Sequence, residues 1–195
     1  MPIATSVAGV TGLAHERLVE VIPRQGYAIA PVTFEQVRDL YEARLTIEPA
    51  IARLAAERTT SHVVADLEQL NRQCLMSRDR PDLVGVREAN KAFHGSIARA
   101  TGNQRLTNLA TTMMDELDRI LYLPQLAPLW DRLETTFAEH NRIIDALRNR
   151  DARSAELAAR KHVLANQKSA IETLLASPQL RAVNLLERSS TRSQV

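Results

Sequence analysis

Between Thr33 and Ala176 the apolar residues recur every three or four positions, the spacing that places them on one face of an α-helix. Short breaks rich in proline, glycine, asparagine and aspartate separate these stretches. The expected helices cover residues 33–58, 60–78, 83–100, 104–123, 130–148 and 152–176, with a short one at 180–186. Because the connections are short, the chain is predicted to be all-α, an antiparallel bundle of six to seven helices.

Local signals mark several helix ends. Thr33 followed by Gln36 is a capping-box pattern, and residues 101–103 (TGN) end a helix with a glycine. Pro49 lies inside the first helix and predicts a kink or local break there. In the fourth helix, the residues expected to face the core are Leu106, Leu109, Met113, Leu117 and Leu121.

The segment before the helices has a different pattern. Two short β-prone runs, 18–22 and 27–29, flank Pro23-Arg24-Gln25-Gly26, which has the composition of a turn. Gly26 suits a positive φ. We expect a β-hairpin at about 18–30 with Arg24 at its basic tip.

The chain is therefore expected to have three parts: 1–32 with the hairpin, 33–176 with the helical bundle, and 177–195 with a short helix and a disordered tail. The single Cys74 excludes an intrachain disulfide and fits a reducing cytoplasm. No apolar run approaches the roughly 20 residues of a membrane span. A net charge of +2 means that any contact with nucleic acid must come from a local patch.

Three histidines, His94, His140 and His162, lie on separate expected helices. Asn90 precedes His94 by four residues, so both side chains share one helical face. Neutral imidazoles bind borderline cations through nitrogen lone pairs, and with an oxygen donor nearby they suit Zn, Ni, Mn or Fe. Three neutral ligands leave the charge of the metal uncompensated, so a small anion would be attracted. An isolated helical histidine is more often a plain surface or core residue.

Two separated parts of the chain resemble one family. LVEVIPRQGYAIAPVT looks like the wing of the winged helix-turn-helix in GntR-family bacterial transcription regulators. The segments DLYEARLTIEPAIARLAAER, NKAFHGSIARATGNQRL and EHNRIIDALRNRDARSAELAARKHV resemble the FCD ligand-binding domain of the FadR subfamily, in family-like order and spacing. The resemblance implies an all-helical, FCD-like effector domain that forms a homodimer and controls DNA binding.

The resemblance also implies a site. In many such domains a divalent metal is held by three histidines together with an acidic or amide residue four positions before the first of them. The matching residues here are Asn90, His94, His140 and His162. An arginine on the first helix of the family domain meets a carboxylate ligand and matches Arg44. The implied effector is a small organic carboxylate.

The chain departs from the family pattern in two places. Asn90 stands where aspartate is common, and a neutral amide is a weaker ligand for a cation. Residues 1–16 are too short for the helices that precede the wing, so we expect the DNA-binding part of this chain to be incomplete. Arg24 remains a weak candidate for a contact with phosphate or the minor groove.

Other interpretations stay open at this stage. Arg44 could be a surface residue paired with Glu48 four positions later. The chain could be a helical dimerisation module without DNA binding or sensing. A metal-dependent hydrolase is a further alternative, but the sequence lacks an HExxH motif, and Glu139 beside His140 points to a different side of its helix.

Overall fold

The computed structural model describes residues 19–22, 26–29, 33–76, 83–121 and 132–176. Contacts divide the chain into two units, Met1–Thr33 and Phe34–Val195.

The first unit contains a β-hairpin. Strand β1 (Val19–Ile22) pairs antiparallel with β2 (Gly26–Ile29), with Val19 opposite Ile29 and Ile22 opposite Gly26. Gly26 has a φ of +103°, which a side chain would disfavour at this position after the turn. Arg24, the expected tip residue, lies outside the described residues.

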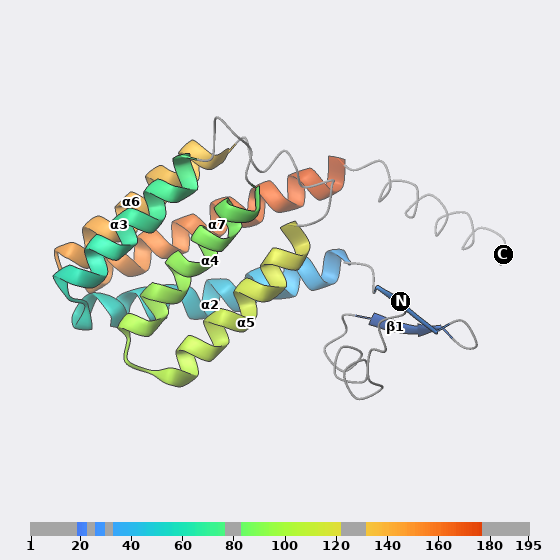
Figure 1. Cartoon of the computed structure of the whole chain (residues 1–195), viewed down its shortest axis with the longest axis horizontal. Coiled ribbons are helices and arrows are strands. Elements are labelled where there is room, and N and C mark those ends of the chain that lie inside the picture. The colour runs from blue at the N-terminus through green and yellow to red at the C-terminus, as the bar shows by residue number, and fades with distance from the viewer. Residues whose placement is uncertain (1–18, 23–25, 30–32, 77–82, 122–131, 177–195) are drawn as a thin grey trace, which may run out of the picture. The chain divides into compact units, whose positions relative to one another are not determined.

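The second unit is an antiparallel helical bundle, as the sequence predicted, and Figure 1 shows that successive helices alternate in direction. The described helices are α2 (Phe34–Arg58), α3 (Ser61–Met76), α4 (Leu83–Ala100), α5 (Gln104–Leu121), α6 (Leu133–Arg148) and α7 (Ala152–Ala176). None of these helices combines the length and apolar character that crossing a membrane requires. The short helix expected at 180–186 lies outside the described residues.

Side-chain caps set several helix starts. Thr60 Oγ1 accepts from the Val63 amide before α3, and Asn103 Oδ1 accepts from the Arg105 amide before α5. Asp151 Oδ1 does the same for α7 by accepting from the Ser154 amide at 2.9 Å. Each cap satisfies a backbone donor that the first helical turn would otherwise leave unpaired.

Helix α2 is central to the bundle, since it contacts α4, α5, α6 and α7. It continues through Pro49 from Phe34 to Arg58, so of the two expected outcomes the local break was wrong, whereas a kink at Pro49 stays a prediction. Proline removes one helical hydrogen bond, at a cost of about 3 kcal/mol in a helix interior. Pro49 is buried, and packing on several sides of α2 offsets this cost.

The core lies between α2 and the helices around it, and its fully buried side chains include Leu67, Phe93 and Leu147. On α5, Met113 and Leu117 are buried as expected, but Leu109 is 50% exposed. The buried face of α5 instead continues through Ala110 and Met114. The expected inward position of Leu109 was therefore wrong by about one residue in helical phase.

Candidate metal centre

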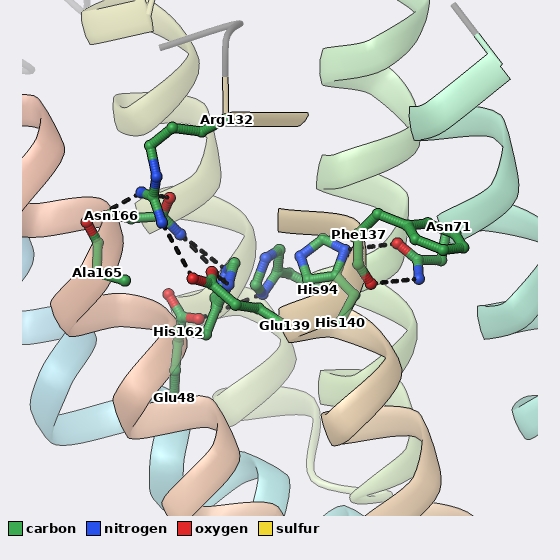
Figure 2. Close-up of polar contacts among 10 residues, drawn as sticks. All are labelled: Glu48, Asn71, His94, Arg132, Phe137, Glu139, His140, His162, Ala165 and Asn166. Carbon is green, nitrogen blue, oxygen red and sulfur yellow. Dashed lines mark hydrogen bonds and ion pairs between the residues drawn. The ribbon is translucent and has the colours of Figure 1, made fainter. Parts of the chain in front are cut away.

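Three histidines from three helices meet inside the bundle. His94 comes from α4, His140 from α6 and His162 from α7, and all are at least nine-tenths buried. One ring nitrogen of each lies within 4.8 Å of the others, and the ring centroids are 4.7–5.4 Å apart. The structure thus brings together residues that are far apart in sequence (Figure 2).

The His94 ring is oriented by a carboxylate on α2. Its Nδ1 lies 3.2 Å from Oε2 of Glu48, and the other oxygen of Glu48 accepts from Nε of Arg44 at 2.5 Å. Arg44 and Glu48 are one helical turn apart, and both are buried. Because a carboxylate only accepts, Nδ1 of His94 carries the proton and Nε2 keeps its lone pair.

The His140 ring is oriented by an amide on α3. Its Nδ1 lies 3.0 Å from Oδ1 of Asn71, whose Nδ2 donates to the Phe137 carbonyl and to Oδ1 of Asn141. Those two acceptors fix the amide, so its oxygen must face the imidazole and accept from Nδ1–H. The ring of Phe93 stacks on the His140 ring, with the two centroids 4.0 Å apart.

The His162 ring is held by a carboxylate on α6. Its Nδ1 lies 2.9 Å from Oε2 of Glu139, and the second oxygen of Glu139 accepts from Arg132 at 3.0 Å. Nδ2 of Asn166, one turn further along α7, lies 3.0 Å from Nε2 and 3.4 Å from Nδ1 of the same ring, and so sits over the imidazole and not along the Nε2 lone pair. All three imidazoles therefore donate from Nδ1 and present the lone pair of Nε2.

The Nε2 atoms of His94 and His140 are buried and find no hydrogen-bond partner among the residues that the structure describes. A buried polar atom without a partner lowers the stability of the folded state, so a ligand that bound to these two atoms would stabilise the protein. Metal-ligating histidines characteristically donate their other ring N–H to a carboxylate or amide oxygen, as these do. The donor set therefore fits a divalent cation of the kind that neutral imidazole binds.

Burial sets the charge state of the cluster. Desolvation holds the pKa of His140 well below 6.5, and the positive charge of Arg44, or of His162 and His94 if they were protonated, acts in the same direction. Burial also lowers the pKa of His162, although its hydrogen bond to Glu139 opposes the shift. These rings are thus neutral near pH 7 and keep the lone pairs that a cation needs.

The glutamate beside the cluster remains charged. Burial raises the pKa of Glu48, but Arg44 and His94 outweigh that effect and hold its pKa well below the usual value. The site therefore contains a buried anion paired with a buried cation.

A cavity of about 80 Å³ opens beside the histidines. Its polar wall includes Arg44, Asn90, Arg132, His162 and Asn166. Its other lining residues are Tyr41, Cys74, Val86, Arg87, Leu117, Leu133 and Thr136. Nη1 of Arg44 is buried and has no hydrogen-bond partner within the described part of the chain. A small molecule with an acceptor oxygen fits this wall.

Four of the residues expected at the site lie close together or on the wall of the cavity. The structure clusters His94, His140 and His162, and Asn90 lies one turn before His94 on the wall of the cavity. Arg44 does pair with Glu48, but it is only 1% exposed, so its interpretation as a surface residue was wrong. Arg44 is buried because other helices pack around α2, and the sequence of α2 alone does not show those contacts.

Four further residues of the site were not identified as such from the sequence. They are Glu48, Asn71, Arg132 and Glu139, which hold the imidazoles or each other. The available signal was the stripe of α2, where Arg44 and Glu48 occupy helical positions in line with the buried Tyr41 and Ala52. Charged residues on an otherwise apolar stripe are buried by the packing of that stripe.

Comparison with known proteins gives a family. The FCD domain model matches residues 39–165. The galactonate operon transcriptional repressor of Escherichia coli (strain K12) is 33% identical over 119 residues, which cover 60% of this chain and 50% of that protein. The HTH-type transcriptional repressor GlaR of the same strain is 26% identical over 78% of this chain and 72% of its own length. The chain thus spans half the length of the first relative and about three quarters of the second.

Solved structures share the fold. E. coli McbR/YncC aligns with a TM-score of 0.73 at 16% identity, over 85% of this chain and 82% of that one. Streptococcus agalactiae GntR aligns with a TM-score of 0.59 at 23% identity, over 83% and 79% of the two chains. With the family match extending over most of the bundle, the chain belongs to the FCD-domain family of GntR-type transcription regulators, whose members are regulators and not enzymes.

Proposed function

We propose that the helical bundle senses a small organic carboxylate through a bound divalent metal, as the effector domain of a bacterial transcription regulator. One observation carries the proposal: three buried imidazoles are oriented by Glu48, Asn71 and Glu139 so that every Nε2 presents its lone pair. Histidines that bind metals are oriented in this way, because a hydrogen bond from the other ring N–H fixes the tautomer and the direction of the ring.

The cation would be held by His94, His140 and His162, with Asn90 as the oxygen donor from the same face of α4. Neutral imidazole and amide ligands suit Zn, Ni, Mn or Fe. The metal, when bound, supplies positive charge and open coordination positions for a carboxylate.

The effector would occupy the neighbouring cavity, which Arg44 lines and where its buried Nη1 has no hydrogen-bond partner among the described residues. A guanidinium recognises a carboxylate through parallel N–H donors. A cavity of about 80 Å³ suits a short organic acid better than a long acyl chain.

The regulatory output follows from linkage. An effector that binds one arrangement of a homodimer more tightly shifts the population toward it, and the DNA affinity of the regulator changes with that population. The relatives that are named transcriptional repressors support this assignment. The β-hairpin, with Arg24 at its expected tip, would serve as the remnant of a DNA-binding wing.

The test uses the full chain in its metal-free and metal-loaded forms. Zinc or nickel should raise the melting temperature of the wild type, and a panel of organic acids should raise it further only after loading. His94→Ala and His140→Ala should abolish both responses, whereas His62→Ala, at an exposed ring on α3, should leave them intact. A response of the two cluster variants equal to that of the wild type would remove the metal from the function.

A further inference from the structure

The cavity beside the histidines is built in layers, because the same spacing recurs on three helices. Helices α2, α4 and α6 run in one direction (Figure 1). On each of them, a residue at the level of the histidine cluster is preceded, one and two turns earlier, by residues that line the cavity. These sets are Glu48, Arg44 and Tyr41 on α2, His94, Asn90 and Arg87 on α4, and His140, Thr136 and Leu133 on α6. The cavity wall therefore extends from the cluster by about two turns, or about 10 Å along the helices.

The layer farthest from the histidines carries a cation. Arg87 lies two turns before His94 on the same face of α4, lines the cavity and is only 6% exposed. With Arg44 and Arg132 it gives the wall three guanidiniums, and none of the described residues that line the cavity is an aspartate or a glutamate. Arg44, near the cluster, and Arg87, in the far layer, thus mark two positions for negative groups of a ligand.

Each of these guanidiniums also has a protein carboxylate near it. Arg44 pairs with Glu48, and Arg132 pairs with Glu139. On α5, burial raises the pKa of Asp118, and the positive charge of Arg87 opposes that shift. Because the three positive and three negative charges cancel, this set of residues has no net charge before a cation binds.

A bound cation would add two positive charges that its ligands do not cancel. The four proposed ligands, His94, His140, His162 and Asn90, would all bind through neutral atoms. One carboxylate would cancel one charge of a divalent ion and leave the other inside a buried site, where an uncompensated charge is costly. A ligand with two negative groups would cancel both.

We propose that the effector is a short dicarboxylate, with one carboxylate at the cation and Arg44 and the other at Arg87. The inference rests on the proposed function and narrows the small organic carboxylate to one class. Val86 and Leu117 also line the cavity, and their apolar side chains suit the methylene linker of such an acid. Arg87 is then the residue that selects for the second charge.

Matched pairs of acids test the second charge. The full chain, loaded with Zn²⁺, is titrated by calorimetry with malonate, succinate and glutarate, and with the monoamide of each, in which a neutral amide of similar size replaces one carboxylate. At neutral pH the best diacid should bind about 10- to 100-fold more tightly than its monoamide, the range for one charged hydrogen bond. Equal affinities within every pair would overturn the dicarboxylate while leaving carboxylate sensing intact.

Variants of Arg87 test its role as the selecting residue. Arg87→Gln should weaken binding of the diacid by about 10- to 100-fold, and binding of the monoamide, which also reports that the protein is folded, should hardly change. Arg87→Lys keeps the charge and should retain a preference for the diacid. Arg99→Gln, at an exposed position on the same helix, should leave both affinities unchanged. Equal weakening of both acids by Arg87→Gln would overturn this role.

Asn90→Asp tests the charge argument without altering Arg87. The added carboxylate should tighten Zn²⁺ binding, measured by competition with a chromogenic chelator, and should reduce the preference for the diacid, because only one charge of the cation then remains to be cancelled. An unchanged ratio of diacid to monoamide affinity, with tighter Zn²⁺ binding, would overturn the proposal. A wild type that binds no Zn²⁺, or that binds neither acid when loaded, would overturn the proposed function together with this inference.

Discussion

Oε2 of Glu48 lies 3.2 Å from Nδ1 of His94, although the two residues come from different helices, α2 and α4. The same carboxylate accepts from Arg44 at 2.5 Å, and Arg44 lines the cavity. Glu48 therefore connects the group that would hold the cation to the group that would meet the effector. A substitution of Glu48 should therefore affect both cation binding and effector binding.

Glu48→Gln should weaken cation binding by about 10- to 100-fold, the usual cost of losing an oriented partner of a metal-binding histidine. The amide oxygen of glutamine could still accept from His94, but its NH₂ group would then face the donors of Arg44. Competition with a chromogenic chelator measures the change.

The matched control is Glu57→Gln, because Glu57 lies on the same helix and pairs with Arg53 at an exposed position. Exposed pairs of this kind contribute little, so cation affinity and the melting temperature should hardly change. Equal cation affinities for Glu48→Gln and the wild type would mean that the carboxylate does not orient His94.

Asn71→Leu should lower the free energy of unfolding by about 2 to 4 kcal/mol, because it leaves several buried polar groups without partners. Asn71 is fully buried and connects His140 to the Phe137 carbonyl and to Asn141. Urea denaturation measures the loss. Asn108→Leu, at an exposed position on α5, should change the stability by less than about 0.5 kcal/mol, and a similar loss in both variants would contradict the role of the buried amide.

The metal-free protein should lose stability as the pH falls from about 7 to about 5. Burial lowers the pKa of His140 and of His162 in the folded state, so below about pH 6.5 the unfolded chain binds protons that the folded chain does not. Each histidine then contributes a slope of up to about 1.4 kcal/mol per pH unit. Glu48 has a lowered pKa and stays ionised in the folded protein, and in the unfolded chain its carboxyl begins to protonate only near pH 5, so it adds little slope across this window.

Urea denaturation in chelator at several pH values measures this dependence. His140→Phe, which keeps an aromatic ring against Phe93, should reduce the slope, and His62→Ala should not, since that ring is exposed. A stability that stays constant or rises toward pH 5 would show that the imidazoles are not held neutral by burial.

Helical spacing predicted the bundle, because each helix buries a continuous apolar stripe and its ends carry local caps such as Asn103 and Asp151. Spacing alone gave Asn90 and His94 a common face, but it could not bring His140 and His162 to the same point. That step depended on the family resemblance, since helix pairing is decided by contacts between distant segments. Burial of the Arg44 side chain was likewise invisible, because its helix is covered on several sides.

The prediction for Glu139 was correct in its direction on the helix but did not include its burial. Glu139 and His140 do point to different sides of α6, but both are buried because different helices cover those sides. His140 faces Asn71 on α3, and Glu139 faces His162 on α7. Glu139 would be exposed on α6 alone. Because α7 packs over that side of α6, Glu139 becomes the hydrogen-bond partner of His162.

Two glycines at the end of α4 and within it should respond oppositely to alanine. Gly102 has a φ of +65°, which costs a residue with a Cβ about 1 kcal/mol or more, so Gly102→Ala should destabilise the protein by about that amount. Gly95 lies inside α4, where an added Cβ would meet the guanidinium end of Arg99, with Nη1 at 3.2 Å and Cζ at 4.0 Å. The Arg99 side chain is exposed and can move, so Gly95→Ala should gain up to about 1 kcal/mol from the higher helix propensity of alanine. Thermal unfolding of both variants measures the two signs, and stabilisation by Gly102→Ala would contradict the helix end described here.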